Sequence, residues 1–159
     1  MIIQGAEMND SRIRVKSKKF KYKTDIKLNG SGEGIVGSEN RNSIKLSVPV
    51  EFGGLPGLWT PEDLLVASVN ACLMTTFLYY AKKQGFKFES YESSAEGTIE
   101  LVDMQYLFTE IKIMPKVTLK SKEDIEKAEK LLNISKKSCL ISNSLKFKVI
   151  LESEVEVVS

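Results

Sequence analysis

Cys72 and Cys139 are the side chains of this 159-residue sequence best suited to nucleophilic or redox chemistry. The sequence contains no histidine, which excludes the Ser-His-Asp triad, the Cys-His pair of proteases and metal sites built on imidazole. Any nucleophile, acid or base must therefore be Asp, Glu, Lys, Tyr, Cys, Ser or Thr. Two thiols in one chain are either small buried hydrophobic residues or a redox pair, and composition leaves both interpretations open.

Length and composition favour a single globular domain over residues 1–159, with 42% hydrophobic and 28% charged residues. The formal net charge of +2 is too small to indicate a nucleic acid or an acidic membrane as partner. Residues 1–7 do not have the pattern of a signal peptide. Because only two cysteines are present, we expect a reducing compartment, the cytoplasm.

The first part of the chain, residues 12–50, is predicted to form strands and turns. From Lys19 to Leu28 polar and apolar residues alternate, which predicts a half-buried strand. A glycine-rich turn follows, and residues 44–48 form the next expected strand. The glycines and proline of residues 53–57 indicate a loop.

A long helix is predicted after this loop. Thr60 is suited to cap its first turn, Pro61 to occupy the first helical position, and the two acids that follow to interact with the helix dipole. The helix should run to Lys83 or Gln84 and end at Gly85. Residues 64–81 carry no charge, which approaches the length of a membrane span. Since several polar residues interrupt this run, we predict instead a helix buried in a core or a subunit interface.

The second half alternates strands with a further helix. Residues 94–102 and 106–119 are predicted strands around a turn at 103–105, and Ser121 opens a second helix. Residues 147–158 alternate again as a final strand. Strands, a long helix, a strand pair, a helix and a strand make an α+β fold.

Three linked motifs carry a resemblance to a known family. Residues 49–54 read Pro-Val-Glu-Phe-Gly-Gly, residues 60–72 run from Thr-Pro-Glu-Asp to Asn-Ala-Cys, and residues 139–144 read Cys-Leu-Ile-Ser-Asn-Ser. In order and spacing they resemble the OsmC/Ohr family of osmotically inducible and organic hydroperoxide resistance proteins. The resemblance extends over about residues 12–158. It implies an antiparallel sheet, a long buried central helix, a second helix and an intertwined homodimer whose sites lie at the subunit interface.

The resemblance also implies a thiol peroxidase that needs no metal or cofactor. Cys72 would be the peroxidatic thiolate that attacks an organic hydroperoxide, and Cys139 would resolve its sulfenic acid as a disulfide. A dithiol such as a lipoyl group would then reduce that disulfide, with no role for nucleic acid or membrane. Glu62 is the third site residue that the motifs imply. Because ten helical residues span about 15 Å, Glu62 can serve Cys72 only from a partner chain.

One departure from the family pattern concerns the activating arginine. The family places an Arg in the early glycine-rich turn or shortly before the Pro-Glu motif, and residues 31–34 and 51–59 contain none. Arg41 is the best substitute, although a solvated turn residue is its simpler interpretation, and Lys45 is a point charge without the guanidinium fork. Two alternatives therefore stay open: a non-catalytic OsmC-like dimer that binds a small apolar ligand or a partner, and a general thiol–disulfide exchanger.

Overall fold

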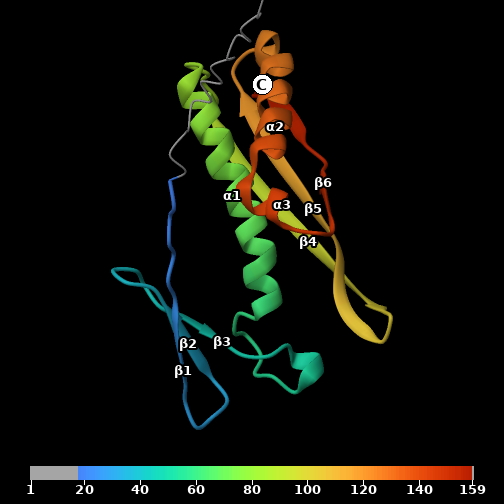
Figure 1. Cartoon of the computed structure of the whole chain (residues 1–159). Coiled ribbons are helices and arrows are strands. Elements are labelled where there is room, and N and C mark those ends of the chain that lie inside the picture. Colours follow the sequence, from blue (N-terminus) through green and yellow to red (C-terminus); the bar gives the residue numbers. More distant parts are fainter. Residues whose placement is uncertain (1–17, 159) are drawn as a thin grey trace, which may run out of the picture.

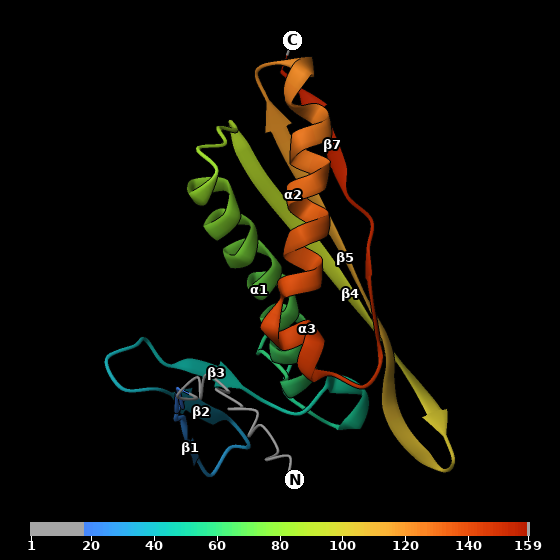
Figure 2. The same cartoon turned by 45° about the horizontal axis from the view of Figure 1, so that its top comes forward.

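The computed structural model describes residues 18–158 of the chain. It is an α+β fold, as predicted, with two sheets and two long helices (Figure 1). The first sheet contains β1 (Asp25–Leu28), β2 (Gly34–Gly37) and β3 (Ile44–Leu46), paired antiparallel in that order. It lies to one side of the rest of the fold, and both views show it beyond the N-terminal end of α1 (Figures 1 and 2).

The second sheet forms the floor on which the helices pack. Its centre is the long antiparallel pair of β4 (Ser90–Val102) and β5 (Gln105–Leu119). Two short strands, β6 (Lys148–Leu151) and β7 (Glu154–Val157), each pair with β5 in parallel. The sheet is therefore mixed. The single final strand predicted for residues 147–158 was wrong, because the chain leaves the ladder at Glu152 and Ser153.

Helix α1 (Pro61–Lys83) begins and ends where the sequence predicts. Thr60 forms a capping box with Asp63: Asp63 N–H donates to Thr60 Oγ1 at 3.1 Å, and Thr60 N–H donates to Asp63 Oδ2 at 3.0 Å. At the other end Gly85 takes the left-handed backbone conformation, with φ of 59°. These local signals determine where α1 begins and ends.

The core lies between α1, the sheet and α2 (Ile125–Ser138), which follows the short 3₁₀ turn η2 (Lys122–Asp124). Helices α1 and α2 lie side by side on one face of the sheet (Figure 2). A single stripe of α1 is fully buried: Val69, Leu73, Phe77 and Ala81. The residues of this stripe pack in two hydrophobic clusters with the inward residues of β5, which include Ile111, Ile113, Val117 and Leu119.

Much of α1 is nevertheless uncovered in the single chain. Met74, Leu78 and Tyr79 expose 37%, 42% and 59% of their surface. By length and composition α1 would also qualify as a membrane span, a test that core helices pass as well. The predicted long buried helix is thus buried along one stripe, and its opposite face remains open.

The strand predicted from Lys19 to Leu28 differs most from the structure. Only its last four residues pair as β1, and all its apolar side chains are exposed, Ile26 by 65% and Leu28 by 76%. The prediction of half-burial was wrong for the described part of the chain, because no other element of residues 18–158 covers this sheet. The β1–β3 sheet is connected to the segment before α1 by a hydrogen bond in which Ser47 N–H donates to the Trp59 carbonyl at 2.9 Å.

Candidate functional site

Cys72 lies three turns into α1, at the border between its buried stripe and its open face. Its neighbour Leu73 is completely buried, whereas Ala71 is exposed and Cys72 itself is half-buried. The Cys72 carbonyl accepts two side-chain hydrogen bonds, from Thr75 Oγ1 at 3.1 Å and from Thr76 Oγ1 at 2.7 Å. A thiol at this border touches the core and can still be reached from outside.

Cys139 lies at the junction between α2 and α3 (Leu140–Ser144), and none of its surface is exposed. Its backbone leaves the helical conformation there, with φ of −65° and ψ of 112°. Ser142 Oγ donates a hydrogen bond to its sulfur at 3.1 Å. The break between the two helices at Cys139 leaves its side chain buried.

The structure brings the two thiols together. Neither cysteine is in a disulfide. Burial is the largest cause that raises the pKa of Cys139 above its ordinary value, and the interaction with the Cys72 side chain raises it further. The Cys72 side chain therefore lies close enough to the Cys139 sulfur to influence its ionisation. The contact joins residues that are far apart in the sequence, and sequence reasoning expected it only from the family resemblance.

Glu62 lies apart from the thiols in this chain. It occupies the first turn of α1, ten residues and about 15 Å of helix rise before Cys72. Its Oε2 atom is buried, and no group in the described part of the chain hydrogen-bonds to it. A buried carboxylate oxygen without a partner is unfavourable in free energy. The described residues therefore leave this oxygen without a hydrogen-bond donor.

The two candidate cations belong to the β1–β3 sheet and bond within it. Arg41 is an exposed turn residue whose Nη1 donates to Ser38 Oγ at 3.3 Å and to the Glu39 carbonyl at 3.2 Å. This matches its simpler interpretation. Lys45 Nζ pairs with Glu33 Oε2 at 3.2 Å.

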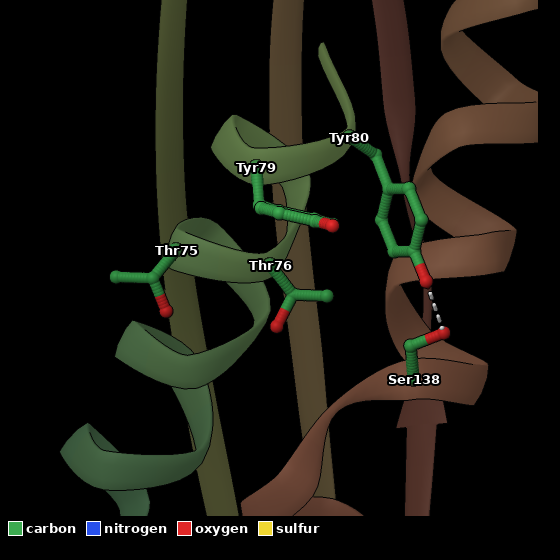
Figure 3. A pocket seen from close by; sticks show the side chains of 5 residues that line it. All are labelled: Thr75, Thr76, Tyr79, Tyr80 and Ser138. Carbon is green, nitrogen blue, oxygen red and sulfur yellow. Dashed lines mark hydrogen bonds between the residues drawn. The ribbon is translucent and has the colours of Figure 1, made fainter. Parts of the chain in front are cut away.

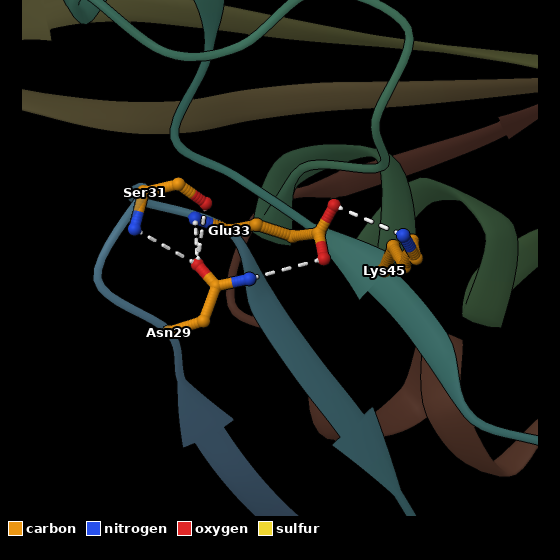
Figure 4. Close-up of polar contacts among 4 residues, drawn as sticks. All are labelled: Asn29, Ser31, Glu33 and Lys45. Atoms are coloured by element: carbon orange, nitrogen blue, oxygen red, sulfur yellow. Dashed lines mark hydrogen bonds and ion pairs between the residues drawn. The ribbon is translucent and has the colours of Figure 1, made fainter.

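The Glu33 side chain is held from both sides (Figure 4). Opposite Lys45, Asn29 Nδ2 donates to Glu33 Oε1 at 3.2 Å. The Asn29 Oδ1 atom accepts from the backbone N–H groups of Ser31 and Glu33 and from the Ser31 hydroxyl. This network stabilises the turn between β1 and β2, and it leaves Lys45 bonded to a carboxylate.

A pocket of about 270 Å³ opens between α1 and the end of α2 (Figure 3). Every residue that lines it carries a hydroxyl group: Thr75, Thr76, Tyr79, Tyr80 and Ser138. The Tyr80 side chain crosses from α1 to α2, where its hydroxyl lies 2.9 Å from Ser138 Oγ. Sequence reasoning missed this pocket. Its only signal was the placement of four hydroxyl residues at helical spacing just after Cys72.

The comparisons with known proteins agree with this fold and these motifs. The sequence model of the family described as OsmC-like protein matches residues 52–154. The uncharacterised protein YmaD of Bacillus subtilis is 28% identical over 116 residues, which cover 70% of this chain and 77% of YmaD.

Solved structures are similar over most of the chain. The OsmC-like protein of unknown function VCA0330 of Vibrio cholerae superposes with a TM-score of 0.75 at 22% identity, covering 85% of this chain and 99% of that one. The organic hydroperoxide resistance protein OsmC of Legionella pneumophila has a TM-score of 0.65 at 23% identity, covering 89% and 100%. These likenesses show the fold, and the family match spans both cysteines. The chain belongs to the OsmC-like protein family.

Proposed function

We propose that this protein is a thiol peroxidase that reduces organic hydroperoxides, with Cys72 as the peroxidatic and Cys139 as the resolving cysteine. The observation that carries the proposal is the contact between a half-buried and a fully buried thiol, both reduced. The family includes proteins named for organic hydroperoxide resistance, such as that of Legionella pneumophila.

The proposed reaction uses only these two sulfurs and an external reductant. The Cys72 thiolate attacks the distal oxygen of the hydroperoxide, the O–O bond breaks, and the alkoxide takes up a proton to leave as an alcohol. Cys72 becomes a sulfenic acid. The Cys139 sulfur then attacks the Cys72 sulfur, forming a disulfide and releasing water. A dithiol reductant returns two electrons and restores both thiols.

The surroundings of Cys72 favour an organic substrate. Leu73 fills the core next to it, and Met74 adds apolar surface on the open side. The pocket that begins one turn further along α1 is lined by hydroxyl groups and by no charged side chain. An alkyl or aryl hydroperoxide can bury its apolar surface away from water there, whereas hydrogen peroxide has no apolar surface to bury.

The protein is further proposed to act as a homodimer. Within residues 18–158, two apolar surfaces lack a cover: the open face of α1 and the β1–β3 sheet. In that sheet Ile26, Leu28, Ile35 and Ile44 are each more than a third exposed. A second copy supplies both surfaces in complementary form. Across such an interface, Glu62 of the partner subunit would approach the thiol pair, and its buried Oε2 atom would gain a partner.

The dimer is tested by sedimentation and light scattering of purified protein. Met74→Glu places a charge on the open face of α1 and should yield monomers. Asn133→Glu, at an exposed position of α2, is the matched control and should leave the dimer intact. A native protein that sediments as a monomer at micromolar concentration would overturn this part of the proposal.

The activity is tested by following consumption of cumene hydroperoxide with dihydrolipoamide as the reductant. Cys72→Ser should abolish consumption, whereas Cys139→Ser, assayed without the reductant, should consume about one equivalent and accumulate a sulfenic acid that dimedone labels. A wild-type protein that consumes no hydroperoxide would favour the non-catalytic alternative. One observation favours that alternative already, because Arg41 and Lys45 are both bonded within the first sheet.

A further inference from the structure

Ser142 is the one residue of the described chain whose hydroxyl bonds to a cysteine sulfur. Its Oγ lies 3.1 Å from Cys139 Sγ, within the range of a hydrogen bond to sulfur. Neighbouring serines direct their hydroxyls elsewhere: Ser144 Oγ donates to the Leu140 carbonyl at 2.9 Å, and Ser138 contacts Tyr80. The Ser142 contact is therefore specific to the sulfur.

The junction that carries this contact is held in place by Asn143. Its backbone N–H donates to the Cys139 carbonyl at 3.0 Å, and its side-chain Nδ2 donates to the Lys137 carbonyl at 2.9 Å. These two bonds connect the end of α2 to α3. They keep the Ser142 hydroxyl and the Cys139 sulfur in register, so that the donor is already in position when the sulfur ionises.

The two sulfurs differ in accessibility. Cys139 is completely buried, whereas Cys72 is half-buried. In a disulfide between them, an incoming thiol reaches the Cys72 sulfur more easily. Attack on Cys72 makes Cys139 the leaving group, and a buried thiolate leaves readily only where a donor stabilises it.

We propose that Ser142 is a positioning residue whose hydroxyl stabilises Cys139 as the thiolate that leaves when a thiol opens the Cys72–Cys139 disulfide. The reductant thiolate forms a bond to Cys72 Sγ, the S–S bond breaks, and its electron pair goes to Cys139 Sγ, which later takes up a proton. A second reductant thiol then releases Cys72 by breaking the mixed disulfide. The inference rests on the redox pairing proposed above.

The electrostatics of Cys139 agree with this role. Burial is the largest influence and raises the pKa of Cys139, while the hydroxyl and the backbone N–H of Ser142 both lower it. Without the hydroxyl, the pKa of Cys139 would be higher, because less would offset the effect of burial. The thiolate would then be a poorer leaving group. One hydrogen bond to a charged sulfur corresponds to a change of roughly three- to tenfold in the rate at which the disulfide opens.

The experiment starts from protein oxidised with diamide, which forms the disulfide without any hydroperoxide. The disulfide is opened with 2-mercaptoethanol, quenched with iodoacetamide and mapped by peptide mass spectrometry. We expect the mixed disulfide on Cys72 and the alkyl group on Cys139. Ser142→Ala should slow the opening three- to tenfold at neutral pH, whereas Ser142→Thr and the control Ser144→Ala should keep the native rate.

Three results would overturn the inference. These are a mixed disulfide on Cys139, a native rate for Ser142→Ala, or a folded Ser142→Thr variant as slow as Ser142→Ala. Because diamide replaces the hydroperoxide, failure of the peroxidase proposal is a separate outcome. If the thiols do not react with hydroperoxide but the disulfide opens as described, the role of Ser142 is supported and the proposed peroxidase activity is refuted.

Discussion

Oxidation of Cys72 and Cys139 to a disulfide should stabilise this fold substantially, because the bond closes a long loop. The two positions enclose roughly 68 residues, including the rest of α1, β4, β5 and all of α2. Loop-closure entropy for that length corresponds to about 4 kcal/mol at 25 °C, as an upper limit. For a domain of this size the melting temperature should rise by roughly 10 °C. The gain requires that the thiols already face each other in the reduced fold.

The assay compares urea unfolding of reduced protein with that of diamide-oxidised protein, and Cys139→Ser carried through the same oxidation is the control. We expect a higher midpoint for the oxidised protein and no change for the control. An oxidised monomer that is less stable than the reduced protein would show that the bond distorts the fold. The contact between Cys72 and Cys139, on which the site depends, would then be refuted.

Three further perturbations test the fold that positions the site. Leu73→Ala, at a completely buried position beside Cys72, should cost about 3 kcal/mol in urea unfolding, and a loss below 1 kcal/mol would contradict the packing of α1. Gly54→Ala should lower the melting temperature, because an added Cβ would collide with the Val48 carbonyl in the loop before α1; an unchanged melting curve would argue against that loop conformation. Hydrogen bonding to Lys116 lowers the pKa of Glu156, so its stabilising contribution is complete above its ordinary pKa and lost as the pH falls through the lowered value. Melting curves between pH 2 and 7 should show a smaller loss on acidification for Glu156→Gln than for the native protein, and identical losses would exclude the pair.

The parts of the fold that could be predicted from the sequence are those determined by local interactions. The bounds of α1 follow from the Thr60–Asp63 capping box and from the left-handed Gly85, both of which act within a few residues. The β4–β5 hairpin and α2 were likewise predicted to within a few residues from their periodicity.

The parts that could not be predicted depend on contacts between distant segments. Alternation from Lys19 to Leu28 indicated one buried face. Whether a face is covered depends on what packs against it, and no other element within residues 18–158 does so. The predicted final strand is divided into β6 and β7. Both pair with β5, and Glu152 and Ser153 between them do not belong to a strand. Alternation alone does not reveal such a break.

The candidate site shows the same division. The residue types and their spacing singled out both cysteines, and the family resemblance paired them. Their contact arises because α2 runs antiparallel to α1 (Figure 2), so that its last residues return to the side of α1. No local pattern encodes this arrangement. The hydroxyl-lined pocket also depends on this return, because Tyr80 of α1 meets Ser138 of α2 there. The Ser142 hydroxyl bond to Cys139 is local, three residues apart.

The most direct test of the account is a thiol count on the reduced protein before and after one equivalent of an organic hydroperoxide, with Cys72→Ser measured alongside. The account predicts that the native protein loses both thiols rapidly and that the Cys72→Ser variant keeps its single thiol. Survival of both thiols through a long incubation would contradict the peroxidase proposal, and the non-catalytic dimer would become the leading interpretation.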